Sequence, residues 1–141
     1  MPTWNTSVWT PEIVVVHLGT NDFYAAPTDD TLYQSTHVTF LQTLRGYYPK
    51  ALIVVTTSPM LSDYYPTDAR TNKIQASWTD EETNIKAVVA VRAAAGDTNL
   101  ALLTIQPQTG PDYGEDYHPT AAPHESIATQ LVTLVNSLEN W

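Results

Sequence analysis

The chain contains three short runs of aliphatic residues. After each run comes a segment in which the apolar residues are spaced differently. The runs occupy residues 12–18, 51–57 and 99–105 and are rich in Val, Ile and Leu. Continuous apolar runs of this length are typical of parallel strands that are buried on both faces. We therefore expect three buried strands.

The segments between and after these runs carry apolar residues at the three- and four-residue spacing of a helix. One such helix is predicted between residues 29 and 49, and a polar loop over 58–78 follows the second strand. Thr79 and Glu82 fit a capping box that begins a second helix, and Gly96 ends it. The apolar stripe of the last predicted helix consists of Ile127, Leu131, Leu134 and Leu138.

The predicted order β-α-β-α-β-α indicates one three-layer α/β/α domain over residues 1–141, with a parallel sheet and right-handed crossovers. In such folds, ligands bind at the carboxyl ends of the strands. Two polar segments fall there: 19–22, GTND, follows the first strand, and 114–120, GEDYHPT, follows the third. Neighbouring strands lie about 5 Å apart, so we expect side chains of the two segments to converge.

The composition excludes several classes of partner. The 141 residues carry 15 acidic and 6 basic side chains, a formal net charge of −9, and no Lys/Arg cluster. We therefore expect neither nucleic acid nor an anionic membrane as a partner. No apolar run approaches the roughly 20 residues of a membrane-spanning helix. The absence of cysteine excludes disulfides and thiolate metal sites.

Three residues of the two polar segments form a candidate catalytic group. His118 is the strongest candidate for a general base, because imidazole titrates near neutral pH. Asp116, two residues earlier, is a candidate for orienting the imidazole. Asn21 offers a neutral N–H donor pair that is suited to stabilising an oxyanion. The group lacks a nucleophile.

Each of these features has a structural alternative. Residues 19–22 fit a turn in which Asn and Asp side chains bond to their own backbone, and His118 fits the approach to a helix capped by Thr120. The position of both segments at the same edge of one sheet favours a site. His17 and His37 fit packing roles in a buried strand and on an apolar helix face; His124 fits a helix start.

A metal site is a further alternative. Asp22, Asp116 and His118 carry the carboxylate and imidazole groups that suit several divalent ions. Their spacing matches no recognised ligand pattern, so we do not expect a metal site.

The two polar segments resemble sequence blocks of a known family. VVVHLGTNDF and GEDYHPTAAPHESIA resemble the third and fifth blocks of the SGNH (GDSL-type) serine hydrolases. The closer likeness is to the second carbohydrate-esterase family, which includes acetyl-xylan esterases. It rests on LGTNDF, FLQTLRGYYPKALI and the Asp-aromatic-His-Pro order. The resemblance implies a flavodoxin-like SGNH hydrolase fold.

The resemblance also assigns roles to individual residues. It makes Asn21 the oxyanion-hole amide, His118 the catalytic base and Asp116 the carboxylate that orients it. Gly19 and Asp22 match positions that support the loop. Broader family members place the acid three residues before the histidine, where this chain has Glu115, so the choice between the two acids stays open.

The family's nucleophile has no counterpart in this sequence. By resemblance it is the serine of a Gly-Asp-Ser motif after the first strand, and an oxyanion glycine follows the second strand. No Gly precedes an Asp-Ser pair here, and Ser58 lies in TTSPM, which offers no nucleophile elbow. We therefore expect residues 1–141 to be the C-terminal part of an SGNH hydrolase domain, with the last three strands and their helices.

The resemblance implies a carbohydrate O-acetyl esterase that uses a Ser-His-Asp mechanism and acts on an acetylated polysaccharide or oligosaccharide outside the cell. Such a reaction needs neither a cofactor nor a metal. No signal peptide is visible in the sequence. We expect the chain alone to be inactive, and a non-catalytic carbohydrate-binding or interaction module derived from such an esterase is the alternative. Strand 12–18 would be an unprotected edge, open to the missing N-terminal half or to self-association.

Overall fold

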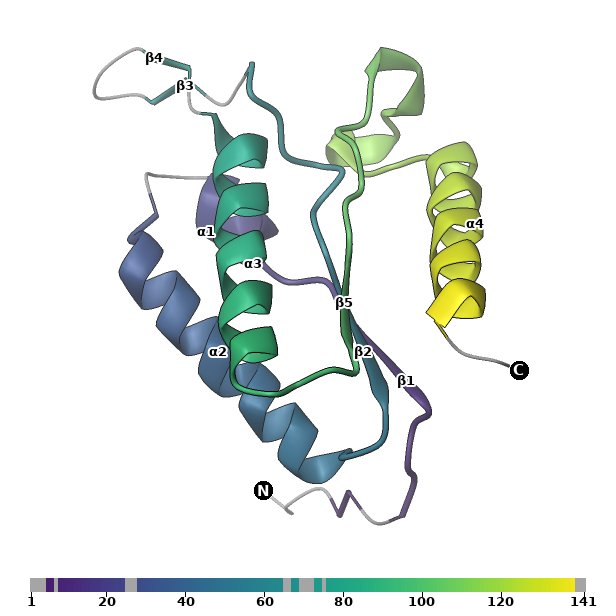
Figure 1. Cartoon of the computed structure of the whole chain (residues 1–141). Helices are drawn as coiled ribbons and strands as arrows, with labels where there is room; N and C mark the ends of the chain where they lie inside the picture. The colour runs from purple at the N-terminus through teal and green to yellow at the C-terminus, as the bar shows by residue number, and fades with distance from the viewer. Residues whose placement is uncertain are drawn as a thin grey trace.

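The chain forms a parallel sheet with helices on both of its faces (Figure 1). The strands are β1 (Ile13–Val16), β2 (Leu52–Thr56) and β5 (Leu100–Leu103), in the order β1-β2-β5. Both pairings are parallel, with Ile13 opposite Leu52 and Ile53 opposite Leu100. The computed structural model describes residues 5–6, 8–24, 28–64, 67–68, 73–74 and 76–138.

Helices α2 and α3 cover one face of the sheet and α4 covers the other (Figure 1). This arrangement confirms the expected three-layer α/β/α architecture. Two short 3₁₀ turns, η1 and η2, follow β5. The helical elements are α1 (Thr20–Tyr24), α2 (Asp30–Tyr47), α3 (Ser77–Ala94), η1 (Gly110–Asp112), η2 (Glu115–Tyr117) and α4 (Ala121–Leu138).

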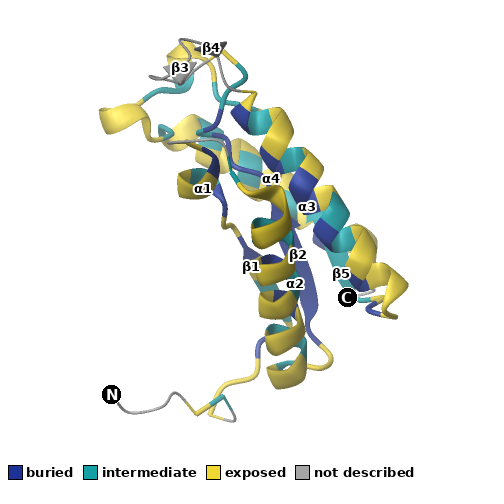
Figure 2. Ribbon diagram, turned by 90° about the vertical axis from the view of Figure 1, so that its left-hand side faces the viewer, coloured by how far each residue is buried: buried dark blue, intermediate teal, exposed yellow. Residues whose placement is uncertain are grey.

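The central strand carries most of the core. All of β2 is buried, and its side chains alternate between the two faces. Ile53 and Val55 pack with the side of α2 and α3, whereas Leu52 and Val54 pack with the side of α4. Figure 2 shows the buried residues along β2 and on the inner sides of the helices.

The first strand differs from its prediction. It is confined to Ile13–Val16 and is only half-buried, with Val15 46% exposed. His17 lies beyond the strand and is exposed, so its predicted place inside a buried strand is wrong. The physical reason is that β1 is an edge of the sheet in the described part of the chain and has a partner on one side only.

The start of α3 also differs from its prediction. The helix begins at Ser77, and the side chain of its N-cap residue makes no capping hydrogen bond, so no capping box is formed. Thr79 instead donates its N–H and hydroxyl to the carboxylate of Asp63, at 2.9 and 2.6 Å. Gly96, with φ of 89°, follows the helix as predicted. The predicted loop 58–78 contains an antiparallel pair, β3 (Thr67–Asp68) and β4 (Lys73–Ile74).

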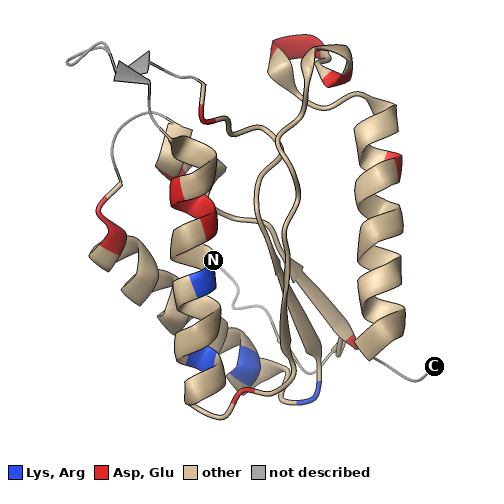
Figure 3. Cartoon of the chain, turned by 45° about the horizontal axis from the view of Figure 1, so that its top comes forward, with Lys and Arg blue, Asp and Glu red and all other residues tan. Residues whose placement is uncertain are grey.

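An ion-pair cluster closes the end of the molecule opposite the polar loops. The carboxylate of Asp97 accepts from the guanidinium groups of Arg45 and Arg92, each at 3.0 Å. Arg45 also donates to the carbonyls of Ala51 and Asn99, at 2.6 and 2.7 Å. The cluster thereby ties α2 and α3 to the amino ends of β2 and β5. Figure 3 shows that Lys and Arg lie towards this end and that acidic residues gather towards the other.

Candidate active site

The loops at the carboxyl ends of the strands surround a cavity of about 650 Å³. Three loops contribute to its wall: the one after β1, the one after β2 and the one after β5. Asn21 and Asp116 both line this cavity, so the predicted convergence of these two side chains is found. The full lining is Thr20, Asn21, Tyr24, Pro59, Met60, Leu61, Ser62, Gln108, Tyr113, Asp116 and Tyr117.

The loop that carries Asn21 depends on Gly19. Gly19 has φ of +134°, in a region that side chains rarely adopt, and its carbonyl accepts the N–H groups of Asp22 and Phe23 at 2.9 and 3.1 Å. Phe23 is 3% exposed and anchors α1 in the core. These contacts leave Asn21 exposed at the cavity. The segment is therefore the start of a short helix, rather than the Asn/Asp side-chain turn that was the alternative.

The segment that carries Asp116 has an unusual backbone. Asp116 and Tyr117 adopt φ values of 49° and 62°, in the left-handed region that non-glycine residues rarely occupy. The side chain of Gln108 donates to the carbonyl of Tyr117, and the N–H of Gly114 donates to the carbonyl of His118 at 2.7 Å. These bonds hold the segment in this conformation. Strained positions of this kind are concentrated at functional sites.

His118 lies beside this cavity and not in its lining. Its side chain is exposed and lines an adjoining hollow of about 320 Å³ together with His17 and His124. Pro59 and Met60 line both spaces, so the two spaces adjoin each other.

The contacts of His118 with the described residues do not include a bond to an acid. Among the side chains that the structure describes, no hydrogen bond or ion pair joins the imidazole of His118 to Asp116 or Glu115. His118, Asp116 and Glu115 do share one shallow surface depression. The orienting acid therefore stays a prediction.

Ser58 is held in a way that is unsuited to a nucleophile. Its residue is 1% exposed, and its Oγ accepts from the hydroxyl of Thr20 at 2.8 Å and from the N–H of Met60 at 3.2 Å. The hydroxyl therefore ties the loop after β1 to the loop after β2. This geometry agrees with the expectation from the sequence that Ser58 is not the nucleophile.

The metal alternative finds no support in the structure. The described ranges contain no group of three or more His, Cys, Asp or Glu side chains placed to hold a metal ion, so Asp22, Asp116 and His118 do not form one. His37, 5% exposed, packs in the core as expected. In the same described ranges, no helix is both long and apolar enough to cross a membrane.

Sequence reasoning missed one buried acid beneath the site. Glu81 on α3 is 1% exposed, and its Oε2 accepts the N–H of Ser58 at 2.7 Å. Burial raises the pKa of Glu81 to about 7, and the charge of Asp22 adds to this rise. The signal was present in the sequence, because Glu81 precedes Ile85 and Val88 on the same apolar helix face.

The chain was compared with known proteins. No family model matches it. Cellulase/esterase CelE of Acetivibrio thermocellus is 28% identical over 139 residues, which are 98% of this chain and 16% of that protein.

Solved structures give a closer view of the same similarity. A family two carbohydrate esterase from Clostridium thermocellum, in complex with cellohexaose, matches 96% of this chain with a TM-score of 0.83 and 29% identity. A family 2 carbohydrate esterase with a carbohydrate binding domain, from Corynascus thermopiles (Myceliophthora fergusii), matches 95% with a TM-score of 0.80 and 32% identity. The resemblance to family two carbohydrate esterases is confirmed.

The match covers only part of each family two carbohydrate esterase. The chain spans 38% and 39% of the two solved chains. Its three-stranded sheet and helices match the C-terminal part of the SGNH hydrolase fold of these esterases. The catalytic roles of Asn21, Asp116 and His118 in this chain stay predictions.

Proposed function

We propose that residues 1–141 form the C-terminal part of a carbohydrate O-acetyl esterase domain. In this proposal the chain supplies Asn21, His118 and Asp116, and polypeptide outside these residues supplies the serine. The observation that carries the proposal is the cavity in which Asn21 and Asp116 meet at the carboxyl ends of the strands. An extracellular location of the whole enzyme is part of the same proposal.

The cavity is suited to a neutral sugar. Tyr24, Tyr113 and Tyr117 line it, and the rings of Tyr113 and Tyr117 meet edge to face at 5.9 Å. Flat aromatic side chains pack well against the apolar faces of pyranose rings. Acidic residues gather towards this end of the molecule (Figure 3), which disfavours anionic ligands. An acetylated polysaccharide or oligosaccharide fits both features, and a relative of similar fold was solved with cellohexaose.

The proposed reaction is a two-step acyl transfer. The serine Oγ attacks the acetyl carbonyl carbon while His118 accepts the serine proton. His118 then passes this proton to the leaving sugar oxygen, and an acetyl-serine is formed. Water activated by His118 hydrolyses the acetyl-serine and releases acetate. The side-chain amide of Asn21 donates to the oxyanion in both steps, and Asp116 or Glu115 orients the imidazole.

Binding tests the part of the proposal that this chain can show alone. We expect cellohexaose and acetylated xylo-oligosaccharides to shift the NMR signals of Asn21 and Tyr117 on titration. Tyr117→Ala should weaken binding about fivefold, because one stacked aromatic contributes on the order of 1 kcal/mol. Tyr64→Ala is the matched control, since Tyr64 is 78% exposed and does not line the cavity. Absence of any shift at millimolar sugar would contradict the proposal.

A non-catalytic carbohydrate-binding module is the second candidate. It is favoured by the absence of a Gly-Asp-Ser motif in the sequence and by the buried, hydrogen-bonded state of Ser58. Both candidates predict sugar binding, so binding alone does not separate them. Acetate release after addition of a nucleophile-bearing N-terminal half does, because only the esterase proposal predicts activity that depends on His118.

A further inference from the structure

One carboxyl group lies beneath two of the loops that form the cavity. The Oε2 of Glu81 accepts the N–H of Ser58, the second residue after β2. A Cβ built on Gly19, in the loop after β1, would lie 2.8 Å from the Oε1 of Glu81. The absence of a side chain at Gly19 therefore makes the space that this carboxyl group occupies. Glu81 touches both loops from below.

Hydrogen bonds lead from this carboxyl group to the cavity wall. The Oγ of Ser58 accepts from the hydroxyl of Thr20 at 2.8 Å and from the N–H of Met60 at 3.2 Å. Thr20 and Met60 both line the cavity, and Thr20 directly precedes Asn21. A change in the strength of the hydrogen bond between the Ser58 N–H and Glu81 therefore affects Thr20 and Met60, which lie on two sides of the cavity.

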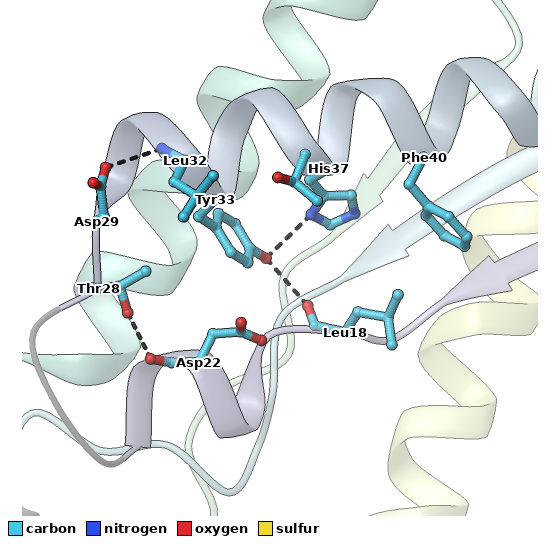
Figure 4. Close-up of a pocket in the computed structure, with 9 residues that line it drawn as sticks. Leu18, Asp22, Thr28, Asp29, Leu32, Tyr33, His37 and Phe40 are labelled. Carbon is cyan, nitrogen blue, oxygen red and sulfur yellow. Dashed lines mark hydrogen bonds between the residues drawn. The ribbon is translucent and has the colours of Figure 1, made fainter.

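Glu81 also interacts with the loop after β1 through the charge of Asp22. Asp22, which directly follows Asn21, lies close enough for its charge to raise the pKa of Glu81, after the larger effect of burial. Figure 4 shows Asp22 opposite Tyr33, whose hydroxyl donates to the carbonyl of Leu18 at 3.2 Å. An ionised Glu81 repels Asp22, and a neutral Glu81 does not.

Other titratable groups lie on the elements that pack around Glu81. On α2, burial raises the pKa of Tyr33 and lowers that of His37, so both are neutral. On α3 itself, Asp80 and Glu82 are neighbours in sequence. The packed strands β2 and β5 carry no titratable side chain.

We propose that Glu81 is a positioning residue of the carbohydrate site: its carboxylate holds Ser58 and repels Asp22, and so fixes Asn21 relative to Met60. The inference rests on the proposed function for the identity of the ligand. A hydrogen bond to an ionised carboxylate is roughly twice as strong as one to a neutral group. Protonation of Glu81 therefore weakens the hold on Ser58 and removes the repulsion of Asp22, and the cavity changes shape.

The test follows the cavity by NMR in the absence of sugar. We expect the signals of the Asn21 side-chain amide and of the Met60 N–H to move with pH, with a midpoint near 7. Glu81→Gln keeps the size of the side chain but not its charge, and it should abolish this transition. Asp22→Asn should lower its midpoint, because it removes a charge that disfavours ionisation of Glu81. Glu82→Gln, on the same turn of α3, is the matched control and should leave the transition unchanged.

Sugar affinity is then measured as a function of pH in the wild type and in Glu81→Gln. Sugar affinity of the wild type should change about fivefold or more across the same midpoint, and Glu81→Gln should remove this pH dependence. If the pH transition is present but no sugar binds, the proposed function fails and the positioning role of Glu81 stands. If Asn21 and Met60 keep the same midpoint in Glu81→Gln, or do not respond to pH, the positioning role is refuted.

Discussion

The substitution Glu81→Gln tests whether the buried carboxyl group destabilises the fold when it is ionised. Burial, and then the charge of Asp22, raise the pKa of Glu81 from 4.5 to about 7. One pKa unit corresponds to about 1.4 kcal/mol, so ionisation of this group lowers the free energy of unfolding by about 3 kcal/mol at pH 8. Because the pKa is raised in the folded state, this penalty is absent below pH 4.5 and grows as the pH rises towards 7.

The Glu81→Gln variant should not show this loss of unfolding free energy. Its side-chain oxygen still accepts the N–H of Ser58, and it carries no charge in the buried position. We expect the free energy of unfolding of Glu81→Gln, minus that of the wild type, to rise by about 2.5 kcal/mol between pH 5 and pH 8, because part of the penalty is already present at pH 5. Urea unfolding followed by tryptophan fluorescence at several pH values measures this difference.

Other titrating groups do not imitate the expected result. Burial lowers the pKa of His37, and partial burial of the imidazole lowers that of His17, whose Nδ1 lies 2.7 Å from the Oγ1 of Thr56 although the residue as a whole is exposed. These two residues therefore make the fold more stable as the pH rises through 6.5. Their contribution has the opposite sign and is common to both proteins, so it cancels in the difference. Glu82→Gln, which loses only a surface pair with Lys86 at 2.9 Å, is the matched control. Parallel pH profiles of the wild type and Glu81→Gln would refute the reasoning.

Four further predictions concern single positions. Gly19→Ala should lower the free energy of unfolding by about 2 kcal/mol or more, because φ is +134° and its Cβ would meet Glu81; Gly46→Ala, where nothing lies within 4 Å, should not. Asp97→Asn should cost about 3 kcal/mol in urea unfolding at pH 7, since it leaves two guanidinium groups unpaired. In an assembled enzyme, Asp116→Asn should reduce kcat far more than Glu115→Gln; the reverse order would assign the role to the other acid. Val15→Lys should reduce self-association through β1 in sedimentation, because a charge blocks edge pairing.

The sequence predicted the elements better than their burial. The apolar run of β2 and the apolar stripe of α2 led to the correct layers, because the spacing of these apolar residues is set by their packing in the core. The same reasoning predicted that His17 is buried, which is wrong. An apolar run does not show that β1 has a partner on one side only. The start of α3 was misplaced because Thr79 bonds to Asp63, sixteen residues away, and not to its own helix.

The candidate site was predictable in part for the same physical reason. Asn21 and Asp116 were expected to lie together because the carboxyl ends of parallel strands share one edge of the sheet, and they do line one cavity although β2 lies between β1 and β5. The place of His118 in the adjoining hollow, rather than in this cavity, depends on loop conformations that no motif encodes. The contact of Glu81 with Ser58 joins two segments that no local sequence pattern relates.

The most direct test of the central claim is acetate release from acetylated xylan by this chain, alone and after assembly with the Gly-Asp-Ser-bearing N-terminal half of a family two carbohydrate esterase. Co-sedimentation first establishes that the two parts assemble. We expect no turnover by the chain alone, and we expect turnover by the assembly that His118→Ala abolishes. Turnover by the chain alone at ordinary enzyme rates of about 1 to 1000 per second, or an assembly whose activity does not depend on His118, would contradict this expectation.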